Sequence, residues 1–179
     1  MNLYFMRHGI ALPSDDLSAG ADRDRPLSPK GMKRIRKAAK GMKGLEISFD
    51  GLLTSPLARA RQTADIVAGA MNSGLPVEEL SSLAPESSIE QLMVDLNRYP
   101  DRGELLLVGH EPSLSHVLSH LLGGKAGRSL HIEFKKGALC RIEIDALPPT
   151  SPAKLHWLLT PKQLRLLGAR PAKHRPNHG

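Results

Sequence analysis

Four consecutive apolar residues near the start of the chain limit its fold more than any other feature. Residues 3–6 (LYFM) leave no face for solvent, so they predict a strand that is buried on both faces of a sheet. Arg7, His8 and Gly9 follow at once. In an open α/β sheet, ligands bind where the strands end. From this tripeptide alone, a binding site and an ordinary polar strand end are equally good interpretations.

Helical and extended patterns alternate along most of the remaining chain. Apolar residues at helical spacing predict helices over residues 29–44, 56–70, 89–96 and 112–122. Shorter apolar runs predict strands over residues 49–54, 76–78 and 104–108. Ser-Pro pairs at 28–29 and 55–56 are typical of an N-cap followed by proline in the first turn of a helix.

The pattern changes in the last third of the chain. We expect consecutive strands over residues 130–134, 138–144 and 154–159, and then a short helix over 161–167. Strands that alternate with helices indicate a parallel sheet, whereas consecutive strands commonly pair antiparallel. We therefore predict an α/β fold: a three-layer sandwich with a mostly parallel central sheet flanked by helices, and extra antiparallel strands late in the chain.

Length and charge narrow the class of protein further. A chain of 179 residues suits one domain with a sizeable core, and we assign residues 1–167 to it. Residues 168–179 are basic and have little to bury, so we expect a disordered tail. The net charge of +7 favours anionic partners such as phosphate esters or an acidic protein. Only three Phe, two Tyr and one Trp could stack on bases, which argues against nucleic acid.

The sequence also argues against a disulfide-bonded, a metal-binding and a membrane-spanning protein. Cys140 is the only cysteine, so an intramolecular disulfide is impossible and a cysteine-based zinc site is not indicated. His116 and His120 stand four residues apart, a spacing that can bind metal, but no third ligand is placed to join them, so we expect no metal site. No run approaches 18 apolar residues, and we expect a cytoplasmic protein without membrane contact.

Three of the predicted strands end in groups that suit a phosphoryl group. The first is followed by Arg7 and His8, the second leads to Arg59, and the third ends in His110. Parallel strands put their carboxyl ends at one edge of the sheet, so these side chains should meet there. Arginine forks suit phosphoryl oxygens, and a neutral imidazole can attack phosphorus to give a phosphohistidine. Nearby positive charges should keep His8 neutral, and Gly9 would let the backbone turn and leave room for the ligand.

Three separated motifs resemble those of the histidine phosphatase superfamily, which has the phosphoglycerate-mutase-like fold. They are RHG at 7–9, SPLARARQTA at 55–64 and GHEP at 109–112. The resemblance runs from residue 1 to about 122. Within the superfamily, the short length and the RPLSPKG segment at 25–31 are most similar to SixA-type phosphohistidine phosphatases.

The resemblance implies a role for each residue that matches a motif. His8 would be the nucleophile that becomes phosphorylated. The phosphoryl oxygens would be bound by Arg7, Arg59 and His110, beside Gly9, with no metal or other cofactor required.

The proton donor is where the sequence departs from the family. Many members carry a glutamate just before an L-x-P element after the second helix, and Ser82 occupies that position here. Glu86 and Glu111 are the candidate replacements, with Asp15 and Asp16 as weaker ones. General acid–base help is typically worth about 10²–10⁴-fold. A site without it should favour phosphohistidine, whose imidazole leaves readily, over ordinary phosphate esters.

The leading hypothesis is a small phosphatase that acts on phosphohistidine in proteins, because so short a chain has few residues for a lid over the site. A phosphatase of small phosphate esters is the second hypothesis. A mutase is the third, but it must exclude water from its intermediate, which normally takes longer insertions than this chain has room for. A module that binds phosphate without turnover is a different class of protein, and the intact His8, Arg59 and His110 argue against it. Arg23, Arg25 and Lys30 could guide an anionic substrate, or they could be ordinary loop charges.

Overall fold

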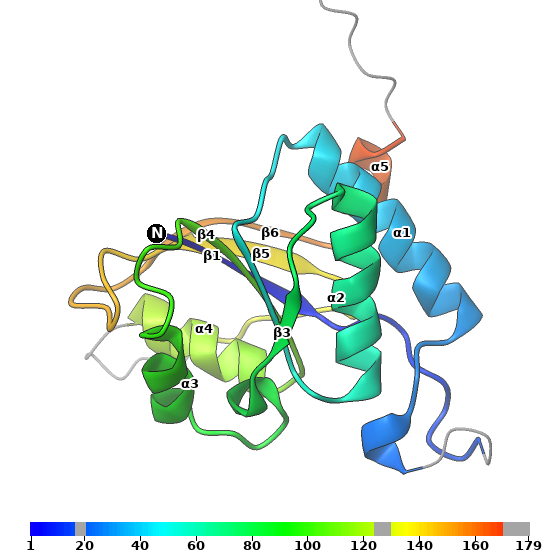
Figure 1. Ribbon diagram of the computed structural model, residues 1–179, viewed down its shortest axis with the longest axis horizontal. Helices are drawn as coiled ribbons and strands as arrows, with labels where there is room; N and C mark the ends of the chain where they lie inside the picture. The colour runs from blue at the N-terminus through cyan, green and yellow to red at the C-terminus, as the bar shows by residue number, and fades with distance from the viewer. Residues whose placement is uncertain (17–20, 124–129, 170–179) are drawn as a thin grey trace, which may run out of the picture.

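The computed structural model of the protein describes residues 1–16, 21–123 and 130–169. Within these residues, six strands form one sheet in the order β3-β2-β4-β1-β5-β6 (Figure 1). The strands are β1 (Asn2–Arg7), β2 (Gly51–Thr54), β3 (Val77–Glu79), β4 (Glu104–Gly109), β5 (Leu139–Glu143) and β6 (Lys154–Leu159). The helices are α1 (Pro29–Gly44), α2 (Ala58–Met71), α3 (Ile89–Leu96), α4 (Ser113–Gly123) and α5 (Pro161–Leu167). Two short 3-10 turns are η2 (Asp22–Asp24) and η3 (Ser81–Leu83).

The sheet is parallel where strands alternate with helices and antiparallel at the end of the chain. β3, β2, β4 and β1 pair in parallel, whereas β5 pairs antiparallel with both β1 and β6. In the pairing of β1 with β4, Arg7 lies opposite Gly109. The His8 N–H then donates to the Gly109 carbonyl over 3.1 Å, and the Ser55 N–H donates to the Val108 carbonyl over 2.9 Å. The three motifs therefore meet at one edge of the sheet.

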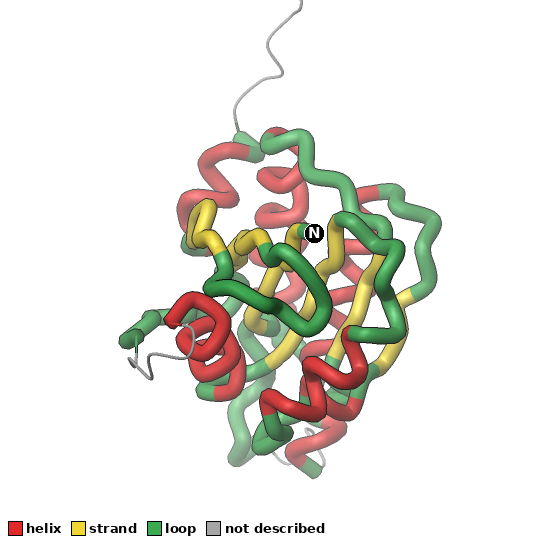
Figure 2. Tube along the Cα trace, turned by 90° about the vertical axis from the view of Figure 1, so that its left-hand side faces the viewer, coloured by secondary structure: helices red, strands yellow, loops and turns green. Residues whose placement is uncertain are grey.

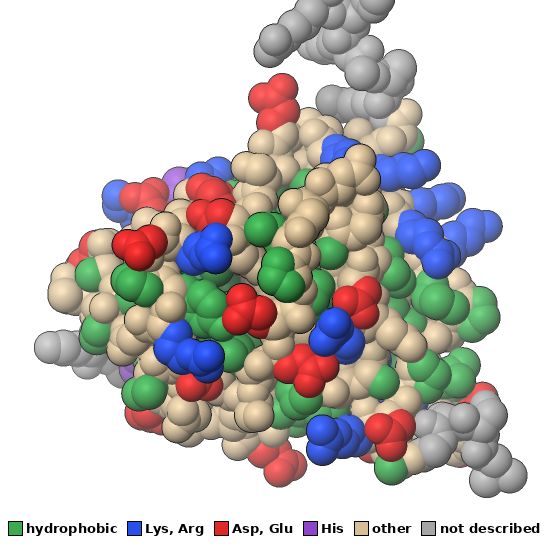
Figure 3. All heavy atoms as spheres, viewed as in Figure 1, with side chains coloured by type: hydrophobic (Ala, Val, Ile, Leu, Met, Phe, Trp, Pro, Cys, Tyr) green, Lys and Arg blue, Asp and Glu red, His purple; other side chains and the backbone are tan. Residues whose placement is uncertain are grey.

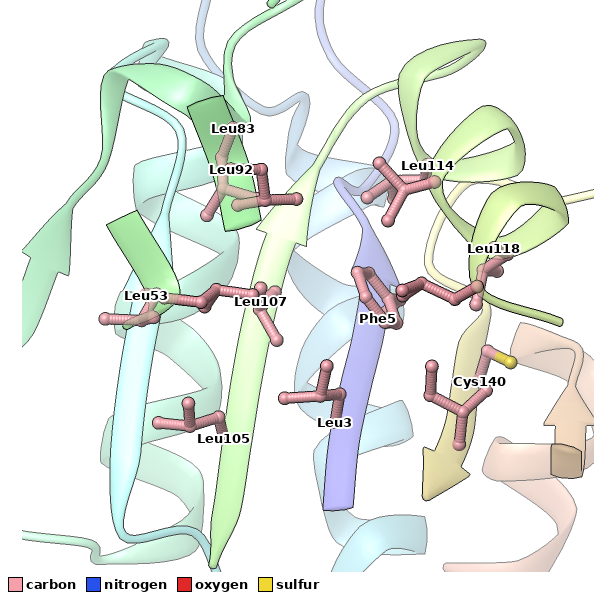
Figure 4. Packing of buried hydrophobic residues seen from close by; sticks show 14 of the residues in the cluster. Leu3, Phe5, Leu53, Leu83, Leu92, Leu105, Leu107, Leu114, Leu118 and Cys140 are labelled. Carbon is pink, nitrogen blue, oxygen red and sulfur yellow. The ribbon is translucent and has the colours of Figure 1, made fainter. Parts of the chain in front are cut away.

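Helices cover both faces of the sheet, which gives the predicted three layers (Figures 1 and 2). Leu3 and Phe5 point to the face covered by α3 and α4, where they pack with leucines of both helices (Figure 4). Tyr4 and Met6 point to the other face and pack against α1, α2 and α5. Apolar side chains on both faces explain why β1 and β4 are apolar at consecutive positions.

Most of the predicted elements are confirmed, with small shifts at their ends. The Ser28 Oγ caps α1 as expected, accepting from the Gly31 N–H over 3.1 Å. α2 begins later than predicted, because Leu57 rather than Ser55 is its N-cap. None of the described helices combines the length and apolar character needed to cross a bilayer. From residue 170 on, the predicted tail lies outside the described residues.

The prediction of a strand over residues 130–134 is wrong. Polar backbone groups of this segment bond to α4 and to β1 side chains rather than to a neighbouring strand. The Leu130 N–H donates to the Ser119 Oγ, and the Ile132 carbonyl accepts from the Ser115 hydroxyl. The Phe134 carbonyl accepts from the Arg7 guanidinium. These side-chain bonds satisfy the backbone without a sheet partner.

Candidate active site

The two histidines of the motifs lie side by side at the carboxyl ends of β1 and β4. His8 directly follows β1, and His110 directly follows β4, the adjacent strand. Their ring centroids are 5.0 Å apart, and the ring planes are inclined by 51°. His8 is 6 % exposed and His110 is 2 % exposed, so both residues are buried.

The hydrogen bond of His8 leaves one ring nitrogen available for attack. Its Nδ1 lies 2.6 Å from the Gly9 carbonyl oxygen. Because a carbonyl only accepts, Nδ1 must carry the proton, and in the neutral ring Nε2 then holds a lone pair. Burial lowers the pKa of His8 to about 3, helped by the positive charges of His110, Arg59 and Arg7 and opposed by the Gly9 bond. His8 is therefore a neutral imidazole near pH 7.

His110 is oriented by a buried serine. Its Nε2 lies 2.8 Å from the Ser55 Oγ, which already accepts from the Leu57 N–H over 3.3 Å. The serine hydroxyl is free to donate to Nε2, and with that bond the ring proton of neutral His110 lies on Nδ1. Burial, followed by the charge of Arg59, lowers the pKa of His110 to about 4, although Asp22 opposes this shift. Like His8, the ring is neutral near pH 7, and Nδ1 can act as a hydrogen-bond donor.

Two arginines stand around these rings, and each is held by a main-chain carbonyl. Nη1 of Arg7 donates to the Phe134 oxygen over 2.7 Å. Nη1 of Arg59 donates to the Asp22 main-chain oxygen over 2.7 Å, and Nη2 donates to Oδ2 of the same residue over 3.1 Å. Burial lowers the pKa of both guanidinium groups, but arginine starts so high that both remain charged.

Three buried side-chain nitrogens within the described ranges have no hydrogen-bond partner, and all three belong to this cluster. They are Nε of Arg7, Nε of Arg59 and Nδ1 of His110. A buried donor without a partner typically costs about 1–3 kcal/mol, so proteins rarely retain one without a function. A tetrahedral oxyanion offers the acceptors that these three donors lack. We name Arg7, His8, Arg59 and His110 the histidine–arginine cluster.

Gly9 allows close packing beside the site. Its N–H donates to the Thr63 Oγ1 over 3.1 Å, and its carbonyl accepts from His8. A Cβ at this position would lie 2.8 Å from Cγ1 of Ile35 in α1. Ile35 thus fills the space that a side chain at this position would need, and a glycine lets α1 approach β1 closely.

The candidate proton donors differ in how near they lie to the cluster. Glu111 is half-buried, and its negative charge acts on the Arg7 guanidinium. Both of its carboxylate oxygens accept from Ser115. Glu86 and Asp15 are exposed, and neither has a side-chain hydrogen bond or ion pair with the described residues. Ser82, which the sequence resemblance matches to the family glutamate, is buried and donates to Oδ2 of Asp95 over 2.6 Å.

Sequence reasoning missed three contributors to the site. Asp22 binds Arg59, and Ser55 orients His110 instead of capping α2. Lys136 has a pKa lowered by burial and by the charges of Arg7, Arg25 and Arg59, so its ammonium lies within electrostatic reach of the cluster. The turn that carries it is fixed to β1, because the Gly137 N–H donates to the Arg7 carbonyl over 3.0 Å. The pair of lysines in the KKG turn was the only sequence signal for this residue.

The cluster combines a neutral nucleophile with fixed donors for an anion. Nε2 of His8 can attack an electrophilic phosphorus, and the surrounding N–H groups can stabilise the charge on its oxygens. Within residues 1–16, 21–123 and 130–169, there is no group of three or more His, Cys, Asp or Glu side chains that could hold a metal ion. The chemistry that these side chains support by themselves is phosphoryl transfer to an imidazole.

Comparison with known proteins agrees with this fold. The chain belongs to the histidine phosphatase superfamily, and the sequence profile of the Histidine phosphatase superfamily (branch 1) matches residues 3–85. It is 37 % identical to an uncharacterised protein of Picosynechococcus sp. over 92 % of this chain and 99 % of that protein.

Two further similarities point to one named enzyme. The chain is 26 % identical to the phosphohistidine phosphatase SixA of Escherichia coli over 94 % of this chain and 99 % of the relative. A solved structure of the protein histidine phosphatase SixA complexed with tungstate superimposes with a TM-score of 0.78 and 25 % identity. That match covers 92 % of this chain and 99 % of the other.

Proposed function

We propose that the protein is a phosphatase that works through a phosphohistidine on His8, and that it acts on phosphohistidine in proteins. Nε2 of His8 attacks phosphorus and forms a P–N bond while the bond from phosphorus to the leaving nitrogen breaks. The leaving imidazole keeps that electron pair and is neutral, because its other nitrogen already carries a proton. Water then attacks phosphorus, Nε2 regains its electron pair, and inorganic phosphate leaves with both protons of the water.

The observation that carries the reaction is the set of unpartnered donors around a neutral imidazole. Nε of Arg7, Nε of Arg59 and Nδ1 of His110 are buried and would bind the three non-bridging phosphoryl oxygens. Their contribution grows as charge develops on these oxygens in the transition state. Similarity to a SixA structure that binds tungstate, a tetrahedral oxyanion, supports the same use of the site here.

The choice of phosphohistidine over esters rests on Ser82. An ester leaves as an alkoxide and needs a proton in the transition state, whereas an imidazole can leave with its own proton. Ser82 offers a hydroxyl that is committed to Asp95, in the place where the family glutamate would donate. Similarity to the phosphohistidine phosphatase SixA of Escherichia coli supports the same preference. A phosphatase of small phosphate esters is the alternative.

A protein carrier for the phosphoryl group is supported by the charge of α1. Figure 3 shows Lys and Arg side chains gathered over this helix without an acidic group among them. The exposed basic residues of α1 are Lys30, Lys33, Arg34, Arg36, Lys37, Lys40 and Lys43. The helix passes beside the site, where Ile35 packs on Gly9, and its 16 residues span about 24 Å in all. An acidic protein surface could bind along this length, which a small ester could not.

One experiment tests the reaction and the substrate class together. The wild type and His8→Ala are incubated with a ³²P-phosphohistidine phosphotransfer domain and, separately, with a panel of small phosphate esters. We expect acid-labile label on the wild type but not on the variant, and faster turnover of the protein substrate. Label retained by His8→Ala would remove His8 from its role. Equal rates on esters would contradict the preference for phosphohistidine.

A gain of activity tests the role assigned to Ser82. If esters are slow because a proton donor is missing, Ser82→Glu should raise kcat on a simple alkyl phosphate by about tenfold or more, with little change on phosphohistidine. Ser81→Glu, one residue away at an exposed position, is the matched control. A Ser82→Glu variant that folds and leaves ester turnover unchanged would show that a missing acid does not limit these substrates.

A further inference from the structure

We propose that Asp22 is a positioning residue that holds the Arg59 guanidinium so that its Nε edge faces the phosphoryl group. The inference rests on the proposed function and assigns Asp22 a place in it. Asp22 lies in η2, in the connection between β1 and α1, and Arg59 lies 37 residues later in the first turn of α2. No sequence pattern indicates that these two residues interact.

The contacts divide the guanidinium into a held end and a free edge. Asp22 accepts at the end formed by the two Nη atoms, with its main-chain oxygen on Nη1 and its Oδ2 on Nη2. Nε is buried and has no partner in the described part of the chain. A guanidinium has five N–H groups, so Nε and one Nη still form a fork that fits two oxygens of a phosphoryl group. Asp22 occupies only the opposite end.

Asp22 is itself fixed by a second arginine. Nε and Nη2 of Arg25 donate to its Oδ1 over 3.0 and 2.7 Å, while Nη1 of Arg25 donates to the Leu12 carbonyl over 2.9 Å. The two carboxylate oxygens thus serve different arginines, Oδ1 binding Arg25 and Oδ2 binding Arg59. Hydrogen bonds from Arg25, together with the charge of Arg59, lower the pKa of Asp22. The carboxylate remains ionised near pH 7 and connects the η2 turn to α2.

A competing interpretation makes the opposite prediction. The Asp22 carboxylate could instead occupy the place of the substrate on a phosphate-binding arginine. It would then have to leave before the substrate binds. Its removal would then tighten the binding of oxyanions, because a negative charge and a competitor both disappear. If Asp22 positions Arg59, its removal lets the guanidinium rotate and weakens binding, despite the gain in positive charge. The unpartnered Nε favours positioning, because Asp22 leaves that edge uncovered.

The sign of the change in oxyanion affinity decides between them. Tungstate affinity is measured by calorimetry for the wild type, Asp22→Ala, Asp22→Asn and Asp24→Ala. Asp24 is a matched control, since it shares η2 with Asp22 and makes no ion pair with Arg59. We expect Asp22→Ala to bind tungstate about tenfold more weakly, Asp22→Asn to recover most of the affinity because it retains an acceptor oxygen, and Asp24→Ala to match the wild type. Unchanged or tighter binding by Asp22→Ala would overturn the proposal.

Kinetics on a turned-over substrate provide the second readout. Asp22→Ala should lower kcat by about 10–100-fold, because the misplaced guanidinium stabilises the transition state less well. A rise in KM alone would contradict this expectation. The Asp22 side chain is 61 % exposed but its partner Arg59 is buried, so we expect a loss of folding stability of about 1 kcal/mol. Tungstate binding does not depend on turnover, so the role of Asp22 can be tested even if the proposed reaction fails.

Discussion

The two arginines of the cluster are held by the same kind of bond in very different surroundings. Nη1 of each donates to a main-chain oxygen over 2.7 Å. Arg7 binds the carbonyl of Phe134, a residue that is 2 % exposed and belongs to the core between the sheet and α4. Arg59 binds Asp22, whose side chain is 61 % exposed and is held by Arg25.

The cluster therefore has a sheet side and a loop side. The sheet side, formed by Arg7, His8 and His110, is fixed by buried backbone and by the register of β1 with β4. The loop side is formed by Asp22 and Arg59. Arg59 is buried, but its partner Asp22 is 61 % exposed, so water and salt reach this ion pair from the Asp22 side. Stability and catalysis should respond together when the sheet side is changed, and they should separate when the loop side is changed.

The largest expected effects on kcat and on the free energy of unfolding come from replacing each arginine with alanine. Arg7→Ala and Arg59→Ala should each lower kcat by about 10²–10³-fold, because each loses a donor to the transition state. Arg7→Ala also leaves the buried Phe134 carbonyl without its donor, so its free energy of unfolding should fall by about 1–3 kcal/mol. Arg59→Ala leaves groups of Asp22, whose side chain is 61 % exposed and can be hydrated, so the loss from unpaired groups should be under about 1 kcal/mol, to which the lost packing of the buried Arg59 side chain adds.

These two variants are compared by steady-state kinetics and by urea unfolding at neutral pH. Asp24→Ala serves as the control for a charge change in the same region. Equal losses of unfolding free energy in Arg7→Ala and Arg59→Ala would contradict the division into two sides.

The buried histidines of the sheet side predict a dependence of stability on acid. The pKa of His8 is about 3 in the folded protein, against 6.5 as an ordinary value, so below pH 6.5 the unfolded chain binds more protons. Stability should therefore fall as the pH drops from 6.5 toward 3. One such histidine contributes at most about 1.4 kcal/mol per pH unit, or about 2 kcal/mol between pH 6.5 and 5.

A variant isolates this contribution from that of all other titrating groups. Urea unfolding of the wild type and His8→Asn is followed from pH 7.5 to 4.5, and the difference between the two curves is compared. We expect the wild type to lose more stability than the variant over this range. Parallel curves would mean that His8 titrates normally in the folded state.

The sheet side was predictable from the sequence because its determinants are local. A fully apolar run predicts a strand buried on both faces, and the residue type that follows it then occupies the carboxyl edge. This is enough to place His8 and His110 at the same edge of the sheet, whereas the pairing of β1 with β4 is known only from the structure. The prediction fails at residues 130–134, whose alternating pattern resembles a strand. The fate of that segment depends on Ser115, Ser119 and Arg7, which lie 11 to 127 positions away.

The loop side was not predictable because its contacts, like those of residues 130–134, join residues that lie far apart in the sequence. Asp22 stands among alternating charges in DRDR, and such charges usually serve solvation. Only the folded chain shows that one of them meets Arg59, whereas Asp24 in the same turn does not. Lys136 is similar, since a lysine in a turn has no pattern that reveals which strand end it faces.

The smallest expected effect on kcat comes from replacing Ser55, whose hydrogen bond orients His110 in the sheet side. Ser55 is fully buried and lies 2.8 Å from Nε2 of His110. In Ser55→Ala the ring loses the donor that favours a proton on Nδ1, so a fraction of the molecules presents a lone pair to the phosphoryl oxygens instead. We expect kcat to fall severalfold, up to about tenfold, with Ser55→Cys in between because a thiol is a weak donor of similar shape. Nitrogen-15 NMR of the His110 ring should show Nδ1 losing proton occupancy in the order Ser, Cys, Ala. A fall in kcat without this change in Nδ1 protonation would mean that Ser55 acts through its packing. Catalysis by the sheet side would then depend on side-chain packing as much as on the position of the His110 proton.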